Sequence, residues 1–184
     1  MNTAFVRTLL VALAIALPIA LPSPAFAASK AELNSSSKQA LDKLIAGAPA
    51  AKALNAKAVA VLVFPSITKA GFMIGGQYGD GVLWQGGKPV GYYNTSGASY
   101  GLQAGAQTYG YAMFFMNKRG LDSLNASEGF EVGVGPSVVV MDQGMAKSTT
   151  TKTYTEDVYA FIFSQKGLMA GLGIQGNKIT KIKK

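Results

Sequence analysis

The sequence predicts an α+β domain whose N-terminal helices pack on a strongly curved, Gly-rich antiparallel β-sheet or partly closed barrel of about 7–9 strands, with one short inserted helix. Helical periodicity dominates the region before residue 59, and after it come short β-type segments separated by turn residues, interrupted by one short helical segment. The 22 glycines allow tight curvature, and a hydrophobic content of 49% supports a folded core. A chain of 184 residues accommodates one such domain.

Residues 1–27 have the pattern of a secretory signal peptide. Arg7 precedes an apolar run from Leu9 to Leu21, and Ala25-Phe26-Ala27 supplies small residues for a cleavage site. Prolines interrupt the apolar run before it reaches the length that a membrane-spanning helix needs. We therefore expect cleavage after Ala27, export to the periplasm or beyond, and one folded domain over residues 28–184.

Residues 28–58 are predicted to be helical. Ser29 and Glu32 have the spacing of a capping box, which marks the start of a helix that ends at Gly47. Pro49 suits the first turn of a second helix running to about Lys57. One face of the first helix is apolar and carries Leu33, Leu41, Leu44 and Ile45.

Residues 59–184 are predicted to be mainly β. Pro65 is expected to end the first strand, and Asn117–Ser127 is expected to form the inserted helix. The expected turns are Gly79–Gly81, Gly86–Pro89, Gln165–Gly167 and Gly176–Lys178. The expected strands are Val59–Phe64, Gly71–Tyr78, Val82–Gln85, Val90–Tyr93, Ser99–Met116, Phe130–Val134, Ser137–Met141, Tyr159–Ser164, Leu168–Gln175 and Ile179–Ile182.

The composition argues against an enzyme and against a cofactor or metal site. The absence of cysteine and histidine excludes disulfides, thiol nucleophiles, His-based triads and His metal ligands. The nine acids are scattered, without the surroundings of a general acid/base pair. Gly171–Gly176 spells a dinucleotide-binding motif, but no helix or ribose-binding acid follows it.

The formal charge of +8 points to an anionic partner, and export makes nucleic acid an unsuitable one. Lysines cluster near both ends of the domain: Lys30, Lys38 and Lys43 in the first helix, and Lys178, Lys181, Lys183 and Lys184 at the C-terminus. Each lysine near an anionic membrane surface contributes about 1 kcal/mol of attraction. The apolar face of the first helix would add to binding if it entered the bilayer. The alternative is that it packs on the protein's own sheet, and the two arrangements exclude each other.

Several segments, most of them containing glycine, follow one another in the order that is typical of one family. They are Val61–Pro65, Lys69–Phe72, Gly75–Val82, Ser99–Gln107, Gly133–Pro136 and Ser164–Leu172. With these segments the chain resembles the SYLF domain from about Ala31 to Ile182. The resemblance implies lipid binding through a basic amphipathic N-terminal helix. It assigns that role to Lys30, Lys38, Lys43 and the apolar face of Leu33, Leu41, Leu44 and Ile45.

These observations predict an exported, non-enzymatic domain that binds phospholipid surfaces peripherally. Eukaryotic members of the family bind phosphoinositides and fungal ones also bind actin, which an exported bacterial protein would not meet. Two alternatives stay open, namely an envelope protein that binds protein partners and a small outer-membrane β-barrel. A Leu41→Asp substitution is expected to abolish vesicle binding without unfolding the domain if the apolar face meets lipid.

Overall fold

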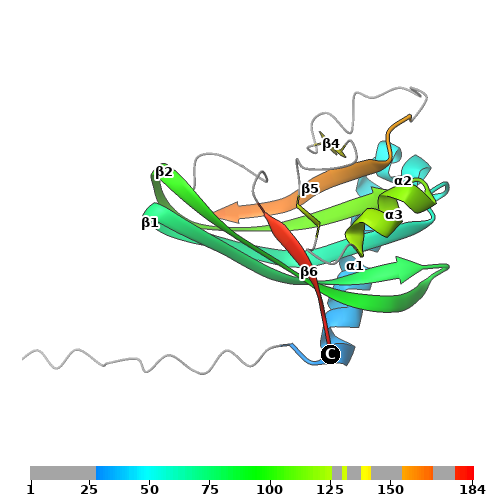
Figure 1. Ribbon diagram of the computed structural model, residues 1–184, viewed down its shortest axis with the longest axis horizontal. Helices are drawn as coiled ribbons and strands as arrows, with labels where there is room; N and C mark the ends of the chain where they lie inside the picture. Colours follow the sequence, from blue (N-terminus) through cyan, green and yellow to red (C-terminus); the bar gives the residue numbers. More distant parts are fainter. Residues whose placement is uncertain (1–27, 126–129, 132–137, 142–154, 168–176) are drawn as a thin grey trace, which may run out of the picture.

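A computed structural model describes residues 28–125, 130–131, 138–141, 155–167 and 177–184 (Figure 1). The α+β class is confirmed, since two helices precede the first strand and a third lies between strands. The helices are α1 (Lys30–Gly47), α2 (Pro49–Asn55) and α3 (Lys118–Leu124). The strands are β1 (Ala60–Gln85), β2 (Lys88–Phe115), β3 (Phe130–Glu131), β4 (Val138–Met141), β5 (Val158–Gly167) and β6 (Lys178–Ile182).

Helix α1 begins at the predicted capping box. The Ser29 Oγ accepts a hydrogen bond from the Glu32 backbone N–H at 3.2 Å, and the Glu32 carboxylate accepts one from the Ser29 N–H at 2.8 Å. Hydrogen bonding of the carboxylate to Ser29, chiefly to its backbone N–H, lowers the pKa of Glu32 because it favours the charged form. Pro49 opens α2 in the first turn, as predicted.

Strands β1 and β2 form one long antiparallel hairpin rather than the several short strands that were predicted. The pairing runs from Ala60 opposite Phe115 to Gln85 opposite Lys88. Gly86 and Gly87 make the predicted turn, with φ angles of +55° and +75° that favour glycine.

Two predicted breaks in β1 are wrong. Pro65 lies inside the strand, at a register shift between Phe64 and Ile67, where an irregular ladder tolerates a residue without an N–H. The expected turn at Gly79–Gly81 is also continuous strand. Gly81 has a packing role, because a Cβ there would lie 2.6 Å from the Phe64 ring.

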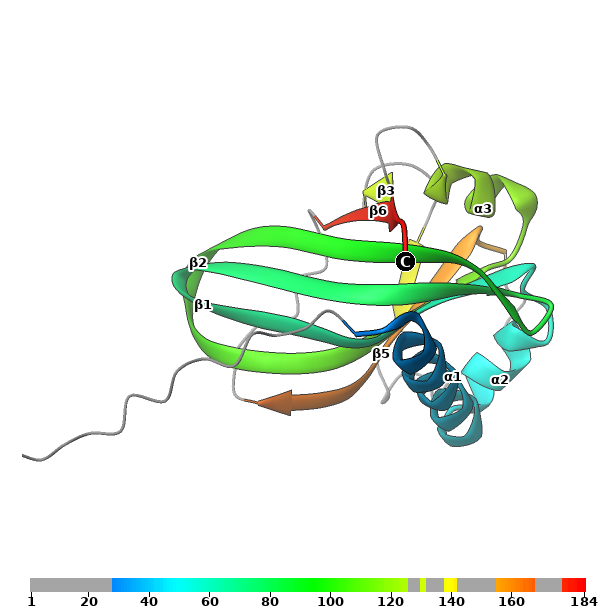
Figure 2. The ribbon, with the colours of Figure 1, turned by 90° about the horizontal axis from the view of Figure 1, so that it is seen from below.

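The hairpin of β1 and β2 is bent back on itself, as Figures 1 and 2 show. At the bend a Cβ on Gly71 would lie 2.2 Å from the Gly75 Cα, so only glycine fits there. The ladder shifts register between Phe72 and Ile74 at the same place. The bend brings the two halves of β1 together and gives the sheet its strong curvature.

The sheet is mixed and open among the described strands. Its order is β3-β6-β2-β5-β4, with β1 also paired to β2. The prediction of a wholly antiparallel sheet is wrong, because β4 and β5 are parallel. Their connection, residues 142–157, is long enough for the crossover that a parallel pair requires. The expected turn at Gln165–Gly167 belongs to β5, and the expected strand Leu168–Gln175 lies outside the described residues.

Both faces of the sheet are packed. Helices α1 and α2 cover one face, where Leu33, Leu41 and Leu44 are only 3%, 6% and 4% exposed against Val61 and Val63. The Trp84 indole N–H donates to the buried Ser37 Oγ at 2.8 Å and joins α1 to β1. The other face carries its own apolar cluster, which includes Leu124 of α3. The apolar stripe of α1 is therefore part of the core.

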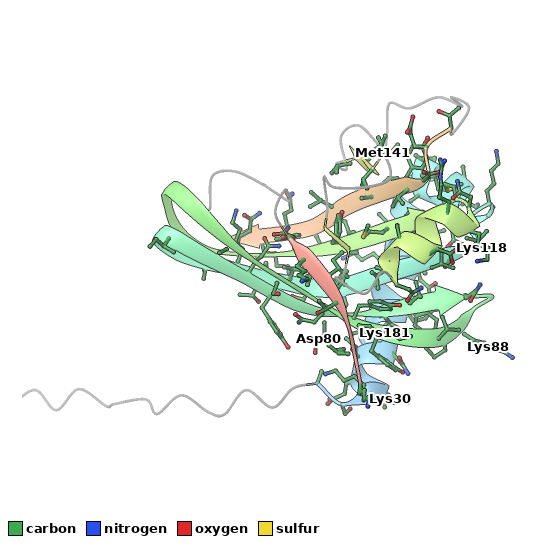
Figure 3. All side chains as sticks on the ribbon, viewed as in Figure 1. Lys30, Asp80, Lys88, Lys118, Met141 and Lys181 are labelled. Atoms are coloured by element: carbon green, nitrogen blue, oxygen red, sulfur yellow. The ribbon has the colours of Figure 1, made fainter. Side chains whose placement is uncertain are left out.

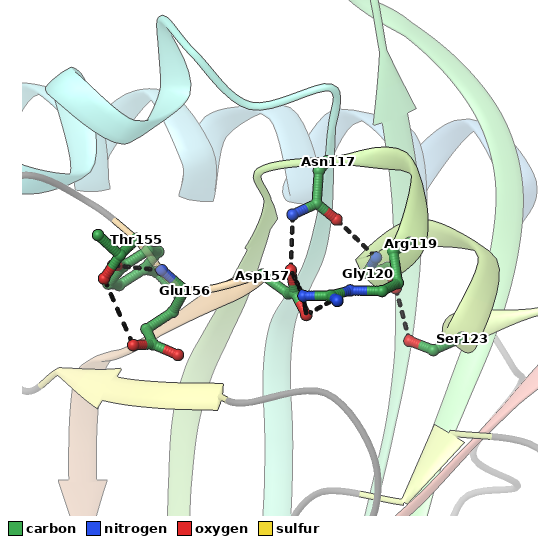
Figure 4. Close-up of polar contacts among 8 residues, drawn as sticks. Asn117, Arg119, Gly120, Ser123, Thr155, Glu156 and Asp157 are labelled. Carbon is green, nitrogen blue, oxygen red and sulfur yellow. Dashed lines mark hydrogen bonds and ion pairs between the residues drawn. The ribbon is translucent and has the colours of Figure 1, made fainter.

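Helix α3 is fixed to the start of β5 through Asp157 (Figure 4). The buried Asp157 carboxylate accepts hydrogen bonds from Arg119 Nη2 at 2.7 Å and from Asn117 Nδ2 at 2.6 Å. The Arg119 guanidinium, with help from Asn117, holds the pKa of Asp157 below its ordinary value. Asn117 also caps α3 by accepting from the Gly120 N–H at 2.9 Å. The predicted inserted helix is confirmed over Lys118–Leu124.

Candidate functional site

The beginning of α1 and the end of β6 meet at one cationic depression, which we call the basic hollow. It has a volume of about 680 Å³. Its cationic lining residues are Lys30, Lys181, Lys183 and Lys184, which come from the two ends of the domain. Figure 3 shows Lys30 and Lys181 close together beside the end of the chain, with Asp80 nearby. The structure thus brings together four of the seven lysines that the sequence singled out.

Pairing between β6 and β2 positions the C-terminal lysines. Ile182 lies opposite Tyr92 and Ile179 opposite Thr95, and the buried Ile179 anchors the strand. Strand β6 therefore runs beside the part of β2 that α1 covers, which places its last residues next to the start of the helix.

An aromatic ring forms part of the wall of the basic hollow. The Lys30 Nζ lies 5.3 Å from the centre of the Tyr92 ring, within the range of a cation–π contact. The Tyr92 hydroxyl donates to Asn34 Oδ1 at 3.1 Å. These contacts hold Lys30 at the rim while its side chain stays exposed.

Lys184 differs from the other lysines of the hollow because it has an anionic partner. Its Nζ lies 2.8 Å from Asp80 Oδ2, and both side chains are only 12% exposed. It also donates to the Ala28 carbonyl at 3.3 Å. Burial raises the pKa of Asp80, but hydrogen bonds from Lys184 and Asn94 outweigh it and leave that pKa below its ordinary value. Lys184 therefore joins the C-terminus to the segment just before α1, while Lys30, Lys181 and Lys183 are exposed.

The other predicted lipid-contacting residues do not line the basic hollow. Lys38 pairs with Asp42 one turn further along α1, Lys43 lines a separate groove, and Lys178 is exposed on β6. The expectation that Leu33, Leu41, Leu44 and Ile45 face a bilayer is corrected. The three leucines are buried against β1, and the half-buried Ile45 packs on the same cluster. An amphipathic helix buries its apolar face wherever a matching surface exists, and the curved sheet supplies one.

Three residues of the site were missed. Asp80 was interpreted as a turn residue, while Asn34 and Tyr92 received no specific role. Glycines on either side of Asp80 favoured the turn, and no local signal relates Tyr92 to Lys30. Their roles depend on the pairing of β2 with β6, which brings residues 92 and 182 together.

A second polar cluster lies buried on the opposite face of the sheet. The Tyr109 hydroxyl donates to Gln77 Oε1 at 3.2 Å, and its burial raises its pKa to about 12. Within the described part of the chain, the Gln77 Nε2, Gln107 Oε1, Tyr111 hydroxyl and Asn177 Nδ2 atoms are buried without a hydrogen-bond partner. Burial likewise raises the pKa of Tyr111. A buried polar atom without a partner reduces stability.

We predict that Tyr111→Phe raises the free energy of unfolding by about 1 kcal/mol, because it removes an unpartnered buried hydroxyl. The matched control is Tyr109→Phe, which should lower stability by about 1 kcal/mol because it removes the bond to Gln77. Urea denaturation of the three proteins measures both changes. A loss of stability in Tyr111→Phe as large as that in the control would contradict the prediction.

The fold and the basic hollow define a class: an α+β domain with a cationic surface made from both of its ends. Residues 96–184 match the sequence model of the Ysc84 family, described as Las17-binding protein actin regulator. Ysc84 is the SYLF domain family, so residues 96–184 of the chain match that family. The match includes Lys181, Lys183 and Lys184 but neither α1 nor β1. A search of curated proteins gave no match.

Two further observations concern the described residues alone. No helix among them has the length and apolar character needed to cross a bilayer. They also contain no group of three or more acidic side chains placed to hold a metal ion.

Proposed function

We propose that the domain binds the surface of anionic phospholipid membranes peripherally and without catalysis, through the basic hollow. The observation that carries this proposal is the convergence of Lys30, Lys181, Lys183 and Lys184 in one depression. The match of residues 96–184 to the SYLF family supports it, because that family is associated with lipid binding or with binding of actin regulators.

The charges of the hollow suit phosphate groups at a membrane surface. Lys30, Lys181 and Lys183 are exposed, so they reach headgroup phosphates without breaking an ion pair among the described residues. Each contributes about 1 kcal/mol of attraction at an anionic surface, and the attraction weakens with salt. Val90, 50% exposed on the rim, adds apolar surface suited to the headgroup boundary.

We also propose a location for the protein outside the cytoplasm. Residues 1–27 have the pattern of a signal peptide, and the protein is proposed to act in the periplasm or beyond after their removal. The phospholipid partner is then the periplasmic surface of a bacterial membrane. The family description names Las17 as a protein partner, and that name describes the family and not this chain. The rival proposal is that the domain binds protein partners in the envelope.

Vesicle co-sedimentation tests this function. The protein is expressed with its own first 27 residues, recovered from the periplasmic fraction, and its N-terminus is identified by mass spectrometry. We expect sedimentation with phosphatidylglycerol vesicles at 50 mM salt, much less at 500 mM, and little with phosphatidylcholine vesicles. Failure to sediment with either vesicle overturns the proposal and favours a protein partner.

A further inference from the structure

We propose that the groove between α1 and the bent hairpin holds one acyl chain of the phospholipid whose headgroup occupies the basic hollow. This inference rests on the proposed function and specifies its ligand as a single phospholipid molecule, recognised at both its phosphate and its hydrocarbon end. The observations that carry it are the character of the groove and its position next to the hollow.

The groove has a volume of about 820 Å³ and a largely apolar lining. The apolar side chains come from α1, β1 and β5, and they include Leu33, Ala40, Pro65, Tyr78 and Phe163. Lys43 and Asp80 are its charged lining residues. A largely apolar concave surface with few charges suits hydrocarbon better than a polar ligand.

Small residues line part of the groove. Ala40 is half-buried on α1 and presents only a methyl group, and Gly79 on β1 has no side chain. A Cβ on Gly79 would lie 2.8 Å from Ile67 Cγ1 and 2.9 Å from the Ser66 carbonyl oxygen, so glycine there lets the two halves of β1 pack closely. Tyr78, which is 59% exposed, adds an aromatic ring to the lining.

The groove adjoins the basic hollow where the C-terminus contacts the segment just before α1. Ala28 and Asp80 line the groove, while Lys184 lines the hollow. Lys184 contacts both of them, through its ion pair with Asp80 at 2.8 Å and its hydrogen bond to the Ala28 carbonyl at 3.3 Å. The cationic hollow and the apolar groove thus lie on either side of Lys184. A phospholipid has the matching arrangement, with its phosphate next to its acyl chains. The second acyl chain would stay in the bilayer.

The test compares a soluble phospholipid with its headgroup alone. Titration calorimetry measures binding of dihexanoyl phosphatidylglycerol below its micelle concentration and of glycerophosphoglycerol, which has the same phosphate but no acyl chain. We expect the acylated molecule to bind at least tenfold more tightly. Equal affinities overturn the acyl-chain inference and leave the proposed function standing. Binding of the acylated molecule alone, without salt dependence, instead counts against the lysines and so against the proposed function.

A substitution in the groove gives the second arm. Ala40→Trp places an indole ring in the groove and is expected to reduce the affinity for dihexanoyl phosphatidylglycerol toward that of glycerophosphoglycerol, with no change in headgroup binding. Ala46→Trp, at an exposed position on the same helix, is the matched control and should bind like the unmodified protein. An unchanged affinity in Ala40→Trp contradicts the inference.

A measurement on the unmodified protein tests the inference even if the Ala40→Trp variant does not fold. A phosphatidylglycerol carrying a nitroxide on one acyl chain should broaden the amide NMR signals of Thr68 and Tyr78, which line the groove. The signals of Lys52 and Leu54 on α2 serve as the reference for non-specific broadening. Equal broadening at both places overturns the inference.

Discussion

Replacing Lys30 and Lys181 together by glutamine should weaken binding to phosphatidylglycerol vesicles on the order of thirtyfold at low salt, since each lysine contributes about 1 kcal/mol at an anionic surface. Both side chains are exposed and line the basic hollow. Titration of the protein with vesicles, followed by co-sedimentation, measures the change. The difference between the double variant and the unmodified protein should shrink as salt rises.

The matched control removes the same charge from a different part of the surface. Lys52→Gln with Lys118→Gln affects exposed residues on α2 and α3, outside the basic hollow. This variant should lose much less affinity than the Lys30/Lys181 variant. Equal losses would show that only net charge matters and that the convergence of the two chain ends has no special role.

Leu41→Asp is expected to unfold the protein rather than to remove a membrane contact. Leu41 is 6% exposed in the cluster that joins α1 to the sheet, so an aspartate there would bury a charge without a partner. Leu41→Ala, which leaves a cavity instead, should cost about 2–5 kcal/mol. Circular dichroism and urea denaturation measure both effects.

The control for this prediction is Ala46→Asp, an exposed position on the same helix. It should keep the fold and change stability by less than about 0.5 kcal/mol. A folded Leu41→Asp protein that fails to bind vesicles would restore the interpretation in which the apolar face of α1 enters the bilayer.

Helix boundaries could be predicted because their signals are local. Ser29 with Glu32, Gly47 before Pro49, and Asn117 before α3 each act on backbone groups within a few residues. The face of α1 was harder to interpret, because the same apolar stripe serves a bilayer or a sheet. Only the positions of Val61 and Val63 against Leu41 and Leu44 decide between them, and these depend on contacts distant in sequence.

The long hairpin was divided in the prediction because Pro and Gly usually interrupt strands. Here the interruptions have tertiary causes that no local pattern contains. Gly81 accommodates the ring of Phe64, and Gly71 approaches Gly75 at the bend. The candidate site was predictable only in part: the basic character of both ends is visible in the sequence, whereas their meeting requires β6 to pair with β2.

The doubled hairpin also limits how such a domain can change in length. One ladder extends through both halves of β1 and β2, so inserting a single residue in either strand would turn every following side chain to the opposite face. The register shifts at Phe64/Ile67, Phe72/Ile74 and Leu83/Trp84 already absorb a mismatch. We therefore expect single-residue insertions and deletions in β1 and β2 to be tolerated best at those three joints.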